Sequence, residues 1–293
     1  MPASRKRRVF WFVAAPIILV LLVLIAYVVN AGGRPAPVPT KENLSEWVTY
    51  RRIVRLLPRP MIAHVLIIDT RAKGLQFLIT PRDNAEGDPL DARTTSRFLE
   101  DFGLTIAVNA DGFHPWWSRG PLDYYPHPGD PVTPNGYAAS RGDVYSEGNG
   151  VQPVLYISRR NALTFNDKPG NVFNAVSGDR MLVLKGSLVD GLDDSELDPR
   201  TAVGINKNGR WLYLVVVDGR QPFYSDGATF AELAELFVDI GAYYAMALDG
   251  GGSSTMVVRG EDGEPLILNS PIDHYIPGTE RPVANHIGIY LEE

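Results

Sequence analysis

The sequence has 293 residues and no cysteine, and this absence removes several kinds of chemistry. Disulfide bonds, thiolate metal sites and a cysteine nucleophile are all excluded. Basic residues are also in the minority, because 28 lysines and arginines stand against 34 acidic residues and give a formal net charge of −6. Overall electrostatics therefore offer no support for a nucleic-acid partner.

Histidine is scarce as well, with five residues, none of them paired at the His-x-x-x-His spacing of a zinc site. We interpret these histidines as loop packing or sugar hydrogen-bonding groups. The acidic stretch 190–198 lacks the regular ligand spacing of a calcium-binding loop, so we interpret it as a solvated turn. The sequence thus predicts neither a metal nor a cofactor.

The N-terminal region contains the one long apolar segment of the sequence. A basic cluster, Arg5 to Arg8, precedes an uncharged run from Val9 to Val29, which is long enough to cross a bilayer as a helix. The basic cluster places the N-terminus in the cytoplasm. The alternative is a cleaved signal peptide, whose apolar region usually spans about 7–15 residues. We favour an uncleaved single-pass anchor, and either interpretation puts the rest of the chain outside the cytoplasm.

We expect the chain to have four segments. Residues 1–8 form a basic cytoplasmic tail and residues 9–30 a transmembrane anchor. Residues 31–42 are rich in glycine and proline and are typical of a semi-extended linker. The remaining residues 43–293 are expected to form one domain, since 45% of the chain is hydrophobic and can bury a large core.

Several segments have clear secondary-structure signals. The β-rich runs 63–69 and 75–79 are separated by a short Lys-Gly sequence and are expected to form a hairpin. A second hairpin joins 202–206 to 211–217, because an Asn-Gly pair supplies the positive φ of a tight turn. The segment 43–57 fits either a strand or a surface helix.

Two helices are predicted within the domain. One covers 94–102 and ends at a glycine, and the other starts at Thr229, where Glu232 completes a capping box. Residues 111–150 have no clear periodicity and are rich in aromatics, which either stack on sugar rings or pin a loop to the core. Strands and helices do not alternate regularly. We therefore expect an α+β fold: a mixed, largely antiparallel β-sheet core with packed helices after the N-terminal transmembrane helix.

The most informative motif follows a predicted strand at 243–248. A carboxylate, Asp249, is followed by three glycines and three hydroxyl residues: Gly250, Gly251, Gly252, Ser253, Ser254 and Thr255. Consecutive glycines let a ligand approach the backbone closely, and exposed N–H and hydroxyl groups suit an anionic group. The alternative is a tight turn with a polar rim.

Five ordered blocks give this chain its resemblance to a known family. They are residues 107–113, 199–204, 217–220, 249–256 and 281–285. Together they resemble the phosphodiester glycosidase family, whose bacterial relatives are of the exopolysaccharide-biosynthesis type. The first block departs from the family pattern, because Asp111 interrupts it and His114 replaces an aromatic residue. This departure leaves the identity of the sugar open.

The resemblance implies a hydrolase that cleaves the glycosidic bond of a sugar-1-phosphodiester. In such a reaction the sugar carbon gains oxocarbenium character and phosphate departs, so the site needs a carboxylate and fixed cations. The residues that match these roles lie in the family blocks. The catalytic candidates are Asp249, Asp218 and Asn109. The substrate-binding candidates are Arg200, Arg220, Arg281, the loop residues Gly250 to Thr255, and Asn285.

Two alternatives remain at this point. The arginines either clamp phosphate or only neutralise the aspartates as structural ion pairs. The whole chain is either this membrane-anchored extracytoplasmic enzyme of envelope or exopolysaccharide metabolism or a non-catalytic polysaccharide-binding envelope protein. A binder would not need both Asp218 and Asp249. The expected partners are a carbohydrate phosphodiester and the membrane, and the sequence leaves the sugar, the second alcohol of the phosphate and the oligomeric state open.

Overall fold

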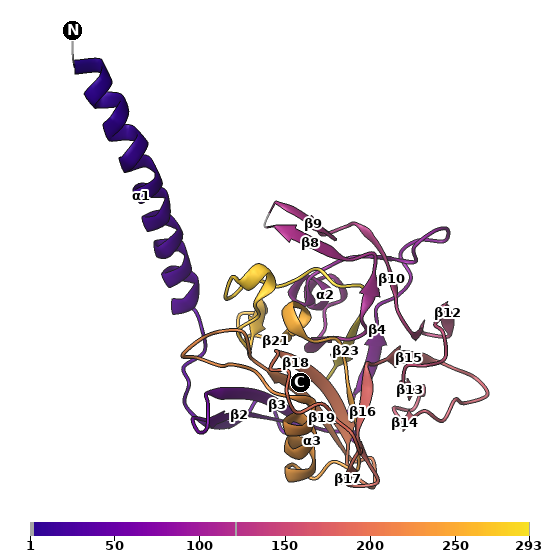
Figure 1. The fold of residues 1–293 in the computed structure, drawn as a ribbon. Coiled ribbons are helices and arrows are strands. Elements are labelled where there is room, and N and C mark those ends of the chain that lie inside the picture. The colour runs from indigo at the N-terminus through magenta and orange to yellow at the C-terminus, as the bar shows by residue number, and fades with distance from the viewer. Residues whose placement is uncertain (1–2, 121, 293) are drawn as a thin grey trace.

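A long helix, α1 (Ala3–Gly32), projects from a body built of β-sheets in this computed structural model, which describes residues 3–120 and 122–292 (Figure 1). The segment Trp11–Gly32 is long and apolar enough to cross a membrane, and none of it is buried in the body. A signal sequence would have the same features. Of the predicted tail 1–8, residues 1–2 lie outside the described residues and the remainder belongs to α1.

The largest sheet has eight strands in the order β1-β2-β3-β19-β18-β20-β16-β17, and each neighbouring pair is antiparallel. The predicted hairpin at 202–217 is confirmed, with Arg200 opposite Val217 and Ile205 opposite Leu212. The strands are β1 (Thr40–Asn43), β2 (Val48–Arg55), β3 (Met61–Asp69), β16 (Arg180–Leu184), β17 (Ser187–Leu188), β18 (Arg200–Ile205), β19 (Trp211–Val217) and β20 (Tyr244–Ala247).

The other predicted hairpin is wrong. Strand β3 pairs with β2 on one side and β19 on the other, whereas β4 (Gln76–Ile79) lies in a different sheet. The physical reason is that β3 is buried along almost its whole length, so it needs a partner strand at each edge rather than one short neighbour. The segment 43–57, which the sequence left undecided, is mostly strand β2.

Two five-stranded sheets pack against the eight-stranded one. The first has the order β22-β21-β6-β23-β4, with β6 (Ile106–Asn109), β21 (Met256–Arg259), β22 (Pro265–Ile267) and β23 (His286–Tyr290). The second has the order β12-β11-β15-β13-β14, with β11 (Tyr137–Ser140), β12 (Asp143–Glu147), β13 (Val154–Ile157), β14 (Leu163–Phe165) and β15 (Asn174–Ser177).

The segment 111–150, which the sequence left without periodicity, contains strands β7 to β12, and β10 also pairs with β5 outside the segment. A three-stranded sheet contains β5 (Leu90–Asp91), β7 (Phe113–His114) and β10 (Pro131–Pro134), and a two-stranded hairpin contains β8 (Trp117–Gly120) and β9 (Asp123–Tyr125). The segment is therefore not a structureless loop. Its strands are too short for alternation to be visible in the sequence.

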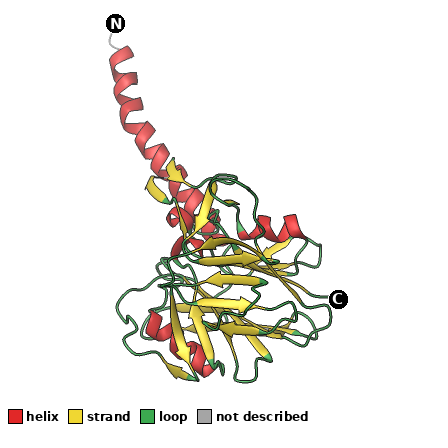
Figure 2. Ribbon diagram, turned by 90° about the vertical axis from the view of Figure 1, so that its right-hand side faces the viewer, coloured by secondary structure: helices red, strands yellow, loops and turns green. Residues whose placement is uncertain are grey.

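The main core lies between the sheets. Apolar side chains from one face of β3, β18 and β19 pack against side chains from β4, β6, β13 and β23. The opposite face of the large sheet is covered by α3 (Phe230–Asp239), whose buried face includes Leu233, Ala234 and Phe237 (Figure 2). The predicted α+β fold with a largely antiparallel core is confirmed.

Both predicted helices are confirmed with their caps. Helix α2 (Thr95–Phe102) is capped by Thr94, and Gly103 ends it with φ +61°. Helix α3 has the full capping box: Thr229 accepts from the backbone of Glu232, and the Glu232 carboxylate accepts from the backbone of Thr229. Each cap satisfies backbone groups that the helix itself leaves unpaired.

The packing of α3 gives a stability prediction. Phe237 is fully buried, and its ring lies so close to Gly204 that a Cβ there would come within 2.7 Å of it. We expect Phe237→Ala to lower the free energy of unfolding by about 3–5 kcal/mol, because it leaves a cavity that the sheet cannot fill. The measurement is urea denaturation of the full chain in detergent, followed by circular dichroism.

The control is Leu188→Ala on the edge strand β17, where the side chain is 43% exposed and little contact is lost. Equal unfolding midpoints for both variants would contradict this account of the core.

Candidate active site

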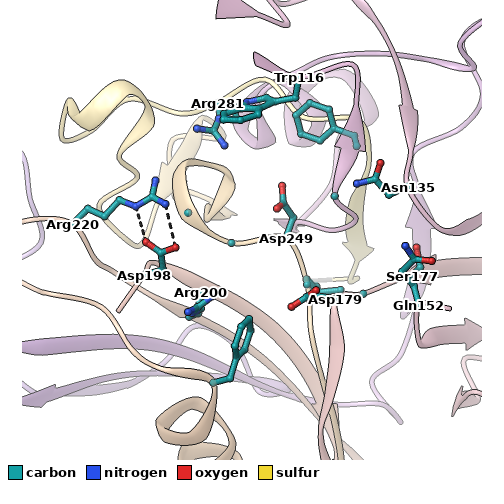
Figure 3. A pocket seen from close by; sticks show the side chains of 17 residues that line it. Trp116, Asn135, Gln152, Ser177, Asp179, Asp198, Arg200, Arg220, Asp249 and Arg281 are labelled. Carbon is teal, nitrogen blue, oxygen red and sulfur yellow. Dashed lines mark hydrogen bonds and ion pairs between the residues drawn. The ribbon is translucent and has the colours of Figure 1, made fainter. Parts of the chain in front are cut away.

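A cavity of about 440 Å³ opens beside the strand ends that carry the family blocks. Its size is in the range of small-molecule sites, about 300–1,000 Å³. Three guanidinium groups and three carboxylates line it, and Figure 3 shows them around the cavity: Arg200, Arg220, Arg281, Asp179, Asp198 and Asp249. The arrangement is typical of a site that binds an anion and acts on it with a carboxylate.

Asp249 follows strand β20 and is fixed by its backbone. Its N–H donates to the carbonyl of Ala110 at 2.8 Å, and its carbonyl accepts from Asn109 Nδ2 at 2.7 Å. Burial raises the pKa of Asp249 from 3.8 to about 6, and the charge of Asp179 adds to the rise, although Ser253 and Arg281 oppose it. The side chain is therefore a carboxyl group that changes charge close to neutral pH.

Asn109, predicted to be catalytic, does not line the cavity but lies behind Asp249 and is fully buried. Its Oδ1 accepts from Thr201 Oγ1 at 2.8 Å and from the backbone of Thr255 at 3.1 Å. One side chain thus connects strand β6, strand β18 and the loop that carries Asp249. This arrangement makes Asn109 a group that positions the site.

Two arginines on the cavity wall are held by aspartates. Arg220 donates through Nε and Nη2 to both oxygens of Asp198, at 2.7 and 3.1 Å (Figure 3). Arg281 binds Asp273 Oδ1 through Nε at 2.8 Å, and its guanidinium lies 5.0 Å from the ring of Trp116. The predicted ion pairs with Asp218 or Asp249 are not the ones formed. Each guanidinium is instead anchored by a different carboxylate.

Arg200 is anchored without an ion pair. Its Nε donates to the carbonyl of Ala228 at 3.0 Å, and Nη2 donates to the carbonyl of Glu196 at 2.9 Å. The guanidinium stacks on Phe230 at 3.9 Å from the ring centroid. All three arginines therefore use Nε and an Nη group on the protein, and Arg281 also donates through its second Nη group to Ser253 Oγ at 3.5 Å. These contacts fix the planes of the guanidinium groups.

The glycine loop, predicted to be an N–H cradle for an anion, uses much of its hydrogen-bonding capacity within the protein. The loop forms a short 3₁₀ turn, η1 (Gly251–Ser253), and most of its amides bond to the protein itself. The amide of Gly251, for example, donates to Pro199 at 2.8 Å. The groups that approach the glycine backbone closely are the guanidinium groups of two arginines. A Cβ at Gly251 would lie 3.1 Å from Arg220, and one at Gly252 would overlap the guanidinium of Arg281.

The hydroxyl residues after the glycines are buried. The Ser253 hydroxyl lowers the pKa of Asp249 through a hydrogen bond. The hydroxyls of Ser254 and Thr255 have no hydrogen-bond partner within residues 3–120 and 122–292. Asn285 does not line the cavity: its Nδ2 donates to Asp111 at 2.7 Å, and the Asp111 amide donates to it in return at 2.9 Å.

Asp218, the second predicted catalytic carboxylate, is buried outside the cavity lining. It lies 2.9 Å from His64 Nε2, accepts from the backbone of Ser270 at 2.7 Å, and accepts from Asn269 Nδ2 at 3.2 Å. Asn269 Nδ2 also donates to the carbonyl of Ser254 at 3.0 Å. Asn269 therefore links Asp218 to the loop that follows Asp249 by hydrogen bonds.

Sequence reasoning missed part of the cavity wall. Asp179 and Asp198 were not singled out from the sequence. Asp179 follows a strand and a glycine, and Asp249 likewise lies after a strand and next to a glycine. Asp198 lies in the acidic stretch interpreted as a solvated turn, directly before the block at 199–204, and that adjacency was the available signal. The remaining missed polar residues are Asn135, Gln152 and Ser177.

A sequence profile of the phosphodiester glycosidase family matches residues 102–290. The chain belongs to the phosphodiester glycosidase family. The catalytic domain of zebrafish N-acetylglucosamine-1-phosphodiester alpha-N-acetylglucosaminidase, auto-inhibited by its pro-peptide, has a similar fold. Its TM-score is 0.61 with 19% identity, and the match covers 90% of this chain and 93% of that one.

A hypothetical protein from Synechocystis is also similar, with a TM-score of 0.64, 15% identity and 88% of this chain covered. The chain spans 64% of the length of that protein. A comparison with curated proteins gave no match. The region matched by the phosphodiester glycosidase profile contains every charged residue of the cavity described above.

The environment of Asp249 gives a prediction about titration. We expect its carboxyl carbon, observed by ¹³C NMR in the full chain, to titrate near pH 6. Ser253→Ala should raise this value further, because it removes a hydrogen bond to the charged form. A midpoint near 4 would contradict the burial of the group.

The same shift has a consequence for stability. The pKa of Asp249 in the folded state lies above its value of 3.8 in the unfolded chain. The protonated carboxyl group therefore adds to the free energy of unfolding at low pH, and this contribution is lost as pH rises from about 4 to about 6. Asp249→Asn should remove this part of the pH dependence.

Proposed function

We propose that this phosphodiester glycosidase is a membrane-anchored, extracytoplasmic hydrolase that cleaves the glycosidic bond of a sugar-1-phosphodiester in envelope or exopolysaccharide metabolism. The observation that carries the proposal is one partly buried carboxyl group, Asp249, with a raised pKa in a cavity that also presents three fixed guanidinium groups. A neutral glycoside would leave those cations without a function. A phosphodiester matches both features.

The arginines fit a phosphodiester because their orientation is set in advance. Arg220 and Arg281 each use Nε and Nη2 on an aspartate, and Arg200 uses the same two groups on backbone carbonyls. The Nη1 groups of Arg200 and Arg220 then remain to bind phosphate, and Nη1 of Arg281 lies beside them, where it also donates to Ser253 Oγ at 3.5 Å. Groups fixed before the reaction stabilise the charge of a departing phosphate without reorganisation.

Asp249 is proposed to act in its charged form, either activating water or attacking the anomeric carbon. The bond between C1 and the bridging oxygen breaks, the oxygen of water becomes the new hydroxyl on C1, and the phosphate leaves as a monoester that keeps the bridging oxygen. A phosphate needs little help from a proton to depart, so a carboxylate is of more use here than an acid.

The experiment incubates the full chain with a panel of sugar-1-phosphodiesters and measures released reducing sugar. Turnover of at least one member supports the proposal. The alternative, a non-catalytic polysaccharide-binding protein, predicts saturable binding to polysaccharide without any release.

Replacing Asp249 separates catalysis from folding. We expect Asp249→Asn to have a melting temperature at neutral pH no lower than that of the parent, because it removes a buried charge, and to lower turnover by about two orders of magnitude or more, since the amide cannot carry that charge. In the parent, kcat/KM should fall as pH falls through about 6, where the carboxylate becomes protonated. A rate that rises toward acid pH would assign Asp249 to proton donation instead.

Asp218→Asn is the matched comparison. Asp218 Oδ2 lies 2.9 Å from His64 Nε2 and accepts from the Tyr224 hydroxyl at 3.3 Å, and an amide nitrogen at that position cannot accept. Asp218→Asn should therefore lower the melting temperature and reduce turnover less than Asp249→Asn does. A larger catalytic loss at Asp218 with unchanged stability would return it to the catalytic role that the sequence suggested.

The arginines are expected to act on phosphate rather than on the sugar. Arg200→Lys and Arg281→Lys keep the charge but lose the anchoring of a planar group that donates in several directions. The loss should be large for a phosphodiester and smaller for an activated aryl glycoside of the same sugar. Equal losses on both substrates would mean that these arginines only hold the surrounding structure in place.

A further inference from the structure

The loops around the cavity expose large apolar side chains. We call the following set the apolar rim: Trp117 and Leu122 of the β8–β9 hairpin, Phe223 of the loop after β19, and Tyr275 and Ile276 at η2 (Asp273–Tyr275). Phe223 is fully exposed and Leu122 is 96% exposed. Phe223 and Tyr275 also have positive φ values of 65° and 61°, which bulky residues rarely adopt.

The rim lies beside the cavity. Arg220 of the cavity wall is 5.7 Å from the ring centroid of Tyr275. The β8–β9 hairpin meets η2 through Ser118 and His274, whose side chains are 3.2 Å apart. Trp116, which lines the cavity, directly precedes the hairpin. Apolar groups therefore lie beside a cavity whose wall is charged.

The rim also lies where the anchor meets the body. The hydroxyl of Tyr224, next to Phe223, donates to the carbonyl of Pro35 at 3.1 Å, and Arg34 lies 5.1 Å from the Tyr224 ring centroid. A Cβ at Gly278, in the η2 loop, would lie 3.9 Å from the carbonyl of Asn30. In Figure 1 α1, the η2 loop and the β8–β9 hairpin lie on the same side of the body.

The tether is short. Helix α1 ends at Gly32, and Pro35 already contacts the body three residues later, which is a span of about 10 Å for an extended chain. A helix that crosses the bilayer therefore holds this face of the body against the membrane surface. Exposed aromatics and aliphatics beside a cation such as Arg119, stacked 5.9 Å from Trp117, are typical of a surface that enters the lipid interface.

We propose that the apolar rim inserts into the bilayer crossed by α1 and that the substrate is a lipid-linked sugar-1-phosphodiester, in which the second alcohol of the phosphate carries the lipid. This inference rests on the proposed function, because it names the alcohol for the same reaction. Water supplies the oxygen of the C1 hydroxyl, and the lipid keeps the phosphate as a monoester in the membrane.

The rim explains how such a substrate reaches the charged cavity. A lipid phosphate lies at the level of the headgroups, so an active site above the surface needs to be lowered to it. Insertion of the rim brings the guanidinium groups to that level. A soluble diester needs no such contact and should be cleaved without the rim.

The test places the full chain in vesicles and compares two diesters of one sugar, one with a long-chain lipid alcohol in the same bilayer and one with methanol. We expect Phe223→Asn with Leu122→Asn to lower kcat/KM on the lipid diester by about tenfold or more, and to change the methyl diester by less than about twofold. Asparagine is chosen because it tolerates the positive φ of Phe223.

The matched control is Leu188→Asn on β17, at the end of the body away from α1 (Figure 1), which should leave both rates unchanged. Equal rates of the rim variant and the parent on the lipid diester overturn the inference. No hydrolysis of either diester by the parent overturns the proposed function instead.

A second measurement tests insertion without any activity. In the Trp11→Phe chain, brominated lipids should quench part of the remaining tryptophan fluorescence, and adding Trp117→Phe should lower that quenched part. Unchanged quenching after Trp117→Phe overturns insertion of the rim whether or not the chain hydrolyses a diester.

Discussion

The carboxamide of Asn109 is the contact on which the site depends. It accepts from Thr201 in the eight-stranded sheet and from the backbone of Thr255, and it donates to the carbonyl of Asp249. A buried amide that makes all of these bonds fixes the relative position of the two sheets and the loop that carries Asp249. Together with the bond from the Asp249 amide to Ala110, it sets the position of Asp249 relative to the arginines.

The charges around the cavity differ in how they are paired. Arg220 and Arg281 are neutralised by Asp198 and Asp273, carboxylates that face them from the side. Asp249 is left with a raised pKa, because burial outweighs the charge of Arg281. The guanidinium groups of Arg220 and Arg281 lie close to the backbone at Gly251 and Gly252, where a Cβ atom would crowd them.

Much of this was predictable from local sequence. The capping box at Thr229, the Asn-Gly hairpin and the Asp249 loop are short-range signals, and the family blocks identified all three arginines of the cavity. The failures concern contacts across the chain. The partner of β3 depends on burial at both of its edges, and the separation of Asp218 from the cavity depends on His64 and Ser270, residues far from it in sequence.

The most direct test of the account is the position of bond cleavage. Hydrolysis of a sugar-1-phosphodiester by the full chain in H₂¹⁸O, followed by mass spectrometry of both products, shows which atom water attacks. Attack at the sugar carbon, with Asp249 and the three guanidinium groups in the proposed roles, places ¹⁸O in the released sugar and none in the phosphate monoester. Label in the phosphate monoester would mean attack at phosphorus and would contradict a glycosidase mechanism.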